Sequence, residues 1–214
     1  MPTVPPPSGE PYARGTILHG FRAAVEDLWG ERAVADIAAR LPLATRVATI
    51  DTLVLPFEWI PIHHGIAWHE AMWAGPARAD ERELARLVSR SIDLGLGRFK
   101  AAFFAGVTKE RLVERAQELW RWQHTHGELT VSVEETSGTV VLTGHPYVDH
   151  ATSRRLTAES YRAIVVLALG EERDVRVAWG SGTASSASQA SVGGAARPGD
   201  PRTPALIVRL NWRA

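Results

Sequence analysis

The chain has 214 residues, of which 45% are hydrophobic and 22% charged, a composition that is ordinary for a globular protein that buries its own core. Its formal net charge is zero, so no overall field attracts nucleic acid or an anionic membrane, and little charge repulsion opposes self-association. It contains no cysteine, which excludes disulfides, thiolate nucleophiles, iron–sulfur clusters and cysteine-type zinc sites.

The N-terminal residues show no pattern of a secretory signal. Residues 1–13 are rich in proline, and we expect a disordered arm there because proline fixes φ and offers no N–H donor. The longest apolar run, Ala163 to Leu169, is far shorter than a membrane span. We therefore expect a cytoplasmic protein without a membrane partner.

The first half of the chain shows helical spacing of apolar residues, interrupted by glycine and proline. The expected helices cover residues 16–29, 34–41, 59–73, 80–92 and 108–124. Residues 43–55 also favour a helix, although their β-branched residues oppose it. Pro61 fits the first turn of the 59–73 helix, and Gly127 is expected to end the last helix in the left-handed conformation.

The second half alternates apolar and polar residues as strands do. Residues 128–135 and 139–143 predict a hairpin that turns at Ser137-Gly138. A helix over 152–169 follows, and then strands over 175–179 and 206–212. This order predicts an α+β fold in which N-terminal helices pack on a C-terminal antiparallel four-stranded sheet.

The predicted organisation is one α+β domain over residues 14–214. Residues 180–204 are nearly all glycine, serine, alanine and proline, a composition too poor in apolar groups to offset ordering. We expect a flexible insertion there, because the entropy of loop closure grows only slowly with length.

Histidines are the first candidates for a binding site. His64, His69, His124, His126 and His145 would form a metal or haem site if their segments met in space. Their spacing does not match the i, i+4 arrangement of zinc motifs. We therefore favour solvated histidines at helix ends and a packed His69, with no metal site.

Tryptophan is the second candidate, with eight residues in the chain. Most are expected to fill the core, but Trp68 and Trp122 fall outside the main apolar stripes of their helices. If exposed, they would line a pocket rim or partner surface. Together with His69 and His124 they form our predicted contacts to a ligand or partner. No pair of carboxylates, phosphate loop or nucleophile elbow stands out, so we expect no catalytic residues.

Several segments resemble a paralogous family of uncharacterised function that is expanded in myxobacteria. The likeness lies in Gly15-Thr16-Ile17-Leu18, in Pro56-Phe57-Glu58-Trp59-Ile60-Pro61, and in Leu119-Trp120-Arg121-Trp122 followed by Gly127-Glu128-Leu129. That family is distantly similar to a ligand-binding superfamily of haem–nitric-oxide domains, 4-vinyl-reductase-like sensor domains and Golgi transport subunits.

The resemblance implies a non-catalytic sensory or scaffold module in signalling. Such a module would bind a small ligand or a protein partner, and a homodimer is possible. One alternative is a haem or metal sensor that uses the histidines, and another is an unrecognised enzyme. The haem relatives carry a Tyr-x-Ser-x-Arg element, which Tyr147-Val148-Asp149-His150-Ala151 does not match. We therefore expect no cofactor.

Overall fold

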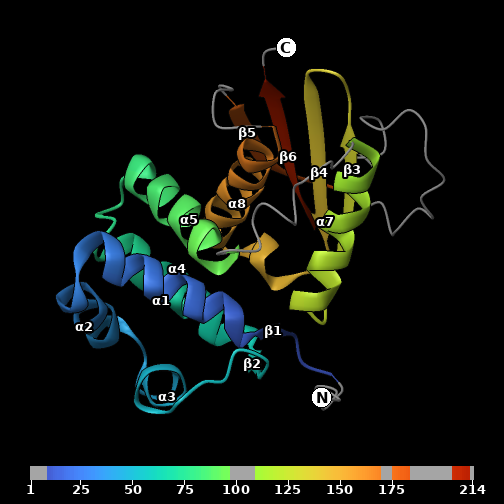
Figure 1. Ribbon diagram of the computed structural model, residues 1–214. Coiled ribbons are helices and arrows are strands. Elements are labelled where there is room, and N and C mark those ends of the chain that lie inside the picture. The colour runs from blue at the N-terminus through green and yellow to red at the C-terminus, as the bar shows by residue number, and fades with distance from the viewer. Residues whose placement is uncertain (1–8, 97–108, 170–174, 184–203, 213–214) are drawn as a thin grey trace. The chain divides into compact units, whose positions relative to one another are not determined.

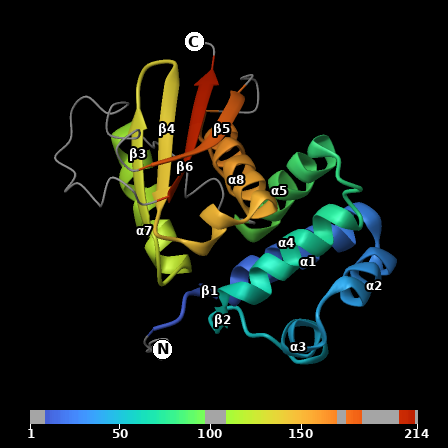
Figure 2. The same ribbon diagram turned by 180° about the vertical axis from the view of Figure 1, so that it is seen from behind.

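The computed structural model describes residues 9–96, 109–169, 175–183 and 204–212 and divides the chain into two compact units (Figure 1, Figure 2). The first comprises Met1–Lys100 with Trp122–Thr125, and the second comprises Ala101–Arg121 with His126–Ala214. Most of the predicted arm and residues 184–203 of the predicted insertion lie outside the described residues. Among the helices described, none is both long and apolar enough to cross a bilayer.

The first unit is mainly helical. Its elements are β1 (Tyr12–Arg14), α1 (Gly15–Trp29), α2 (Glu31–Arg40), α3 (Leu43–Arg46), the π-helical turn η1 (Val47–Asp51), β2 (Trp59–Pro61), α4 (Ile62–Ala74) and α5 (Glu81–Leu96). Helices α1 and α5 pack side by side (Figure 1). Each buries apolar residues at the spacing of one helix face, with Leu18, Phe21 and Val25 on α1.

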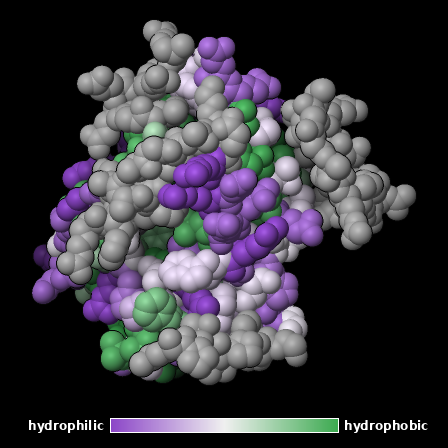
Figure 3. Space-filling view, turned by 45° about the vertical axis from the view of Figure 1, so that its right-hand side comes forward, coloured by the Kyte–Doolittle hydropathy of each residue, from purple (hydrophilic) through white to green (hydrophobic). Residues whose placement is uncertain are grey.

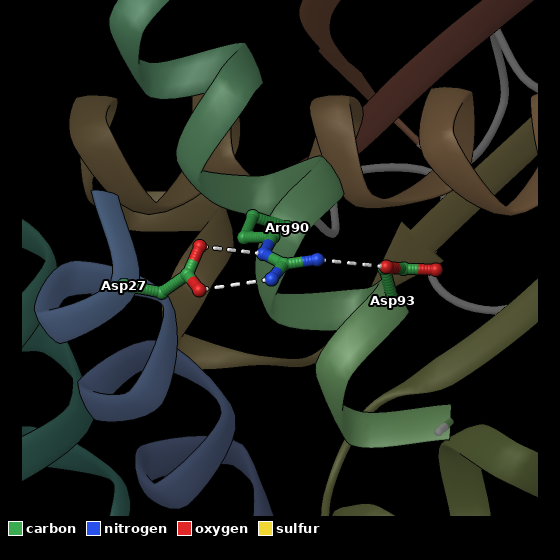
Figure 4. A network of polar contacts seen from close by, with 3 residues as sticks. All are labelled: Asp27, Arg90 and Asp93. Carbon is green, nitrogen blue, oxygen red and sulfur yellow. Dashed lines mark hydrogen bonds and ion pairs between the residues drawn. The ribbon is translucent and has the colours of Figure 1, made fainter. Parts of the chain in front are cut away.

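An ion-pair cluster joins α1 to α5. Arg90 donates two hydrogen bonds to Asp27, at 2.8 and 2.9 Å, and one to Asp93 at 3.1 Å (Figure 4). The Arg90 hydrogen bonds lower the pKa of the Asp27 carboxyl, and the same pairing raises the pKa of Arg90. Because these side chains are solvent-accessible, the cluster adds little to stability.

Two predictions in this unit were inaccurate. Trp59–Pro61 does not begin a helix but forms β2, which pairs antiparallel with β1. The reason is that the residue before a proline favours extended backbone, and β1 supplies a partner strand. The segment predicted as a helix over 43–55 is helical only in α3 and η1, which end at Asp51. Its C-cap residue, Thr52, has an extended backbone.

The second unit is built on a four-stranded antiparallel sheet of order β3-β4-β6-β5. Its elements are most of α7 (Lys109–Gln123), β3 (Glu128–Val133), β4 (Ser137–Thr143), the 3-10 turn η3 (Pro146–Asp149), α8 (Ala151–Leu169), β5 (Val175–Thr183) and β6 (Pro204–Trp212). Helix α8 lies against β5 and β6 (Figure 1, Figure 2). The α+β class and the C-terminal four-stranded sheet are therefore confirmed.

The strands differ in detail from the prediction. Ser137 and Gly138 belong to β4, and Glu134 N–H donates to the Ser137 carbonyl across the turn. Glycine at position 138 is favoured by packing rather than by a turn, because an added Cβ would lie 3.3 Å from the Trp212 ring. Strand β5 continues to Thr183, which pairs with Pro204, so both ends of the predicted insertion are part of the sheet.

Candidate functional site

The predicted contact residues all lie in the first unit, but only one of them is at the surface. Trp68 is 1% exposed, His69 3% and His124 8%, whereas Trp122 is 45% exposed. Trp68 and His69 belong to α4, and His69 packs edge-on against Phe21 of α1. Trp122 and His124 lie instead beside β1, where His124 forms an isolated bridge with Ala13.

These positions confirm a packed His69 and overturn one expectation. The prediction of a solvated His124 at the end of α7 is wrong, because β1 covers that end and the residue is buried. Trp68 does not meet the condition of exposure on which its predicted role depended. Trp122 does meet it.

Two parallel polar contacts tie the short α3–η1 segment to α4. Thr45 Oγ1 lies 2.9 Å from Nδ1 of His64, and the Trp68 indole N–H donates to Thr49 Oγ1 at 2.8 Å. Thr45 and Thr49 are one helical turn apart, and so are His64 and Trp68. The two contacts therefore lie one above the other between the two segments. Thr49 in turn donates to the Thr45 carbonyl at 2.7 Å, which satisfies its hydroxyl.

Burial shifts the pKa of the His64 imidazole. Desolvation lowers the pKa of the His64 imidazole, and the neighbouring His63 lowers it further. The two imidazole rings lie 4.0 Å apart, so a charge on one opposes a charge on the other. Burial and the neighbouring His63 therefore both favour the neutral form of the His64 imidazole.

A buried arginine organises the junction of β1, β2 and the end of α7. Arg14 is 6% exposed, and its guanidinium lies 3.6 Å from the centroid of the Trp59 ring. It donates to the Phe57 carbonyl at 2.6 Å and to the Trp122 carbonyl at 3.3 Å. Burial lowers the pKa of Arg14 from its ordinary value. Sequence reasoning missed Arg14 because no local pattern connects it to residues 57 and 122.

In the second unit, His145 has a structural role. It is 3% exposed and caps η3, with Nδ1 accepting from Tyr147 N–H at 3.2 Å. Its ring packs against Trp120 and Tyr147, at centroid distances of 5.0 and 4.4 Å. Burial raises the pKa of Tyr147, so its phenol stays protonated. The segment after the hairpin is thus a packed, capped turn.

The chain's possible haem ligands can be assessed one by one. All eight histidines lie within the described residues, and cysteine is absent. An axial haem ligand needs an imidazole nitrogen that faces space for the porphyrin. His19, His64 and His145 each direct one ring nitrogen to a protein group, which leaves the second nitrogen of each ring to be considered. His69, His124 and His126 also interact with neighbouring groups, and His63 and His150 are exposed.

No metal cluster is evident either: within the described ranges, no group of three or more histidine, aspartate or glutamate side chains is arranged to hold an ion. Tyrosinate ligation is opposed as well, because burial raises the pKa of Tyr161 as it does that of Tyr147. Among the described residues, these contacts therefore identify no histidine or tyrosine as a haem ligand.

Comparisons with known proteins give a fold but no family. No family model matches the sequence, and no curated protein does. Among solved structures, the chain is similar to an oxygen-binding H-NOX domain related to soluble guanylate cyclases, with a TM-score of 0.57 and 11% identity over 94% of this chain and 95% of that one.

Two further solved structures agree. A mutant Fe(II) unliganded H-NOX protein from K. algicida has a TM-score of 0.54 and 10% identity, over 94% of this chain and 97% of that one. A protein studied for modulation of haem redox potential through porphyrin distortion has a TM-score of 0.55 and 10% identity, over 92% and 99%. The chain therefore has the fold of H-NOX domains, while the resemblance to the myxobacterial family stays a prediction.

Proposed function

We propose that this protein is a non-catalytic sensory or scaffold module that binds a small ligand or a protein partner without haem. The observation that supports this proposal best is the combination of the fold with the contacts of the buried histidines. The fold is that of H-NOX domains, yet the buried His64 contacts Thr45 and the buried His145 caps η3 and packs between two aromatic rings. Fold alone does not determine function, so the residues of the site carry the argument.

The sensory part of the proposal rests on the fold. One of the similar structures is described as an oxygen-binding domain related to soluble guanylate cyclases, so a chain of this fold binds a small ligand in at least that case. The position of the α3–η1 segment against α4 depends on two buried polar contacts, Thr45–His64 and Thr49–Trp68. A ligand or partner that binds one position of the segment better than another would shift its population.

A ligand screen tests this function. Thermal unfolding and tryptophan fluorescence are recorded across a panel of metabolites, with the wild-type protein and with Trp122→Phe. We expect at least one compound class, or one purified partner, to raise the melting temperature in a concentration-dependent way. A well-folded protein that responds to none of them, and retains no partner, contradicts the proposal.

A haem sensor is the second candidate function. It is favoured by the similar structures, two of which are named for haem or for the iron state. Tyr147-Val148-Asp149-His150-Ala151 lacks the serine and arginine of the Tyr-x-Ser-x-Arg element, and its tyrosine is buried in η3. Visible absorption separates the two candidates, because only the second gives a coloured protein.

A further inference from the structure

The first unit exposes a row of large apolar side chains, which we name the apolar strip. It consists of Leu43 (66% exposed), Val47 (45%), Leu53 (79%), Leu55 (57%), Phe57 (64%) and Trp122 (45%). Hydrophobic side chains are visible at the surface at the lower left of Figure 3. Isolated exposed leucines are ordinary, but six large apolar residues on neighbouring segments require an explanation.

The residues of the strip come from one run of the chain and from the end of α7. Leu43 and Val47 are one helical turn apart, and the Val47 carbonyl accepts from Thr52 N–H, which begins the extended segment. Leu53 and Leu55 then alternate with Val54, which is buried. Phe57 and Trp122 are joined through Arg14, since its guanidinium donates to both of their carbonyls.

The segment that carries the strip is held in place by its backbone. The carbonyls of Pro56 and Glu58 accept from the first N–H groups of α1, both at 2.9 Å. His19 Nε2 lies 2.8 Å from the Val54 carbonyl, and Glu58 Oε2 accepts from Leu55 N–H at 3.0 Å. Leu55 and Phe57 are therefore presented by a fixed backbone, which reduces the ordering entropy that binding has to overcome.

The charges beside the strip are of both signs. Arg46 and Asp51 form an exposed pair at 3.4 Å, and Glu58 is also exposed. Beneath the strip lies the buried cation of Arg14. A partner of one charge sign would meet like charges here, whereas a second copy of this chain carries both signs and no net charge. A two-fold interface of this kind uses the same surface on both subunits.

The size of the strip also fits a second copy. Its side chains expose on the order of 600 Å², at the upper end for the largest apolar patch of a monomer. A standard-size interface buries roughly 800 Å² per partner, with aromatic residues and arginine at its centre. The zero net charge of the chain leaves little long-range repulsion between copies. We propose that a second copy of this chain covers the apolar strip in a two-fold symmetric dimer.

The oligomeric state tests the proposal first. Sedimentation velocity of the full chain over a wide concentration range is expected to show a dimer. Leu55→Asp and Phe57→Asp are each expected to shift the protein to monomer, with unchanged circular dichroism. Leu94→Asp is the matched control, because Leu94 is 36% exposed on α5 and outside the strip, and it should leave the dimer intact.

A spin label gives a second readout that does not depend on a disruptive variant. Because the chain has no cysteine, Leu53→Cys provides a single attachment site. We expect dipolar coupling between labels of two protomers, and a different distance for Ala23→Cys on the exposed face of α1. Coupling that is absent at position 53 contradicts a symmetric interface through the strip.

Besides absent coupling at position 53, three sedimentation results overturn the proposal. They are a monomer at every concentration, a dimer that survives both aspartate variants, and a monomer that instead co-sediments with phosphatidylcholine vesicles. The last result would assign the strip to a membrane surface. None of them bears on the ligand screen, so the dimer and the proposed function fail separately.

Discussion

The two units of this protein are stabilised in different ways. In the second unit, strands β3, β4, β6 and β5 form a continuous ladder over a fully buried set of Leu142, Leu206, Val208 and Leu210. In the first unit, buried polar contacts join neighbouring elements, namely the Thr45–His64 and Thr49–Trp68 contacts and the Arg14 guanidinium. The second unit also buries polar groups, but these lie outside the strands, at His145 and on α8.

This difference has a physical consequence. An apolar sheet core is insensitive to pH and tolerates conservative changes, because its stabilisation is non-directional. Buried polar contacts are directional, and losing one partner leaves the other unsatisfied at full desolvation cost. We therefore expect the buried polar contacts of the first unit to respond to a ligand, a partner or a change of pH more readily than the strand ladder of the second unit.

The largest expected effect is in the second unit, at Gly127. It has a φ of +84°, and a Cβ would lie 2.8 Å from the His145 Cβ. Gly127→Val should destabilise the protein by about 3 kcal/mol or more, through backbone strain and collision. Urea unfolding of the wild type and the variant measures this loss of stability.

Gly144 is the matched control for Gly127. Its φ is +63°, but nothing lies within 4 Å of an added Cβ. Gly144→Val should lose only about 1–2 kcal/mol, the strain of the left-handed conformation. Equal losses at the two glycines would show that the contact with His145 does not matter.

The next effect is in the first unit, at Trp68. Trp68→Phe removes the donor to Thr49 and part of a fully buried ring, and should cost about 2 kcal/mol. Trp122→Phe, at an exposed position, should change stability by less than about 0.5 kcal/mol. A double-mutant cycle with Thr49→Val should give a coupling of about 1 kcal/mol, and additive losses would contradict the hydrogen bond.

A smaller effect should appear as pH dependence. Because the folded pKa of His64 is below its unfolded value of 6.5, the unfolded state binds more protons. Stability should therefore fall as pH decreases through 6.5 towards the lower folded pKa, and should be flat above that range. His64→Gln should flatten the acid limb of the melting-temperature profile, whereas His150→Gln, at an exposed position, should not. Identical profiles for the two variants would rule out this role of His64.

The smallest effect is expected when residues 184–203 are replaced by a short turn. The β5–β6 ladder runs from Val175–Trp212 to Thr183–Pro204, so a short hairpin loop preserves every pair. We expect an unchanged melting temperature. A clear loss would mean that the replaced residues stabilise the second unit.

The second unit was the more predictable from sequence. Its strands alternate visibly, and the positive φ of Gly127 follows from a glycine after a helical stripe. The error at Ser137-Gly138 arose because Gly138 accommodates Trp212, a residue far along the chain. The strand at Trp59–Pro61 was missed for the same reason, since its partner is Tyr12–Arg14.

The candidate site was much less predictable. Helical spacing identified Trp68 and Trp122 as unusual but not which of them is buried, because α3 and η1 cover Trp68 through Thr49. The roles of Thr45, Thr49 and Arg14 depend on contacts between distant segments, and a single sequence carries no signal of such contacts. The apolar strip combines α3, an extended segment and α7, so no periodicity marks it.

The haem content of the purified protein tests most directly whether its histidines serve structure rather than iron. The full chain is produced with haem precursor supplied, and its visible absorption and iron content are measured. We expect a colourless protein with no Soret band and no stoichiometric iron, while circular dichroism shows it folded. One haem per chain, with a Soret band that is lost in a single histidine-to-alanine variant, would contradict a haem-free module.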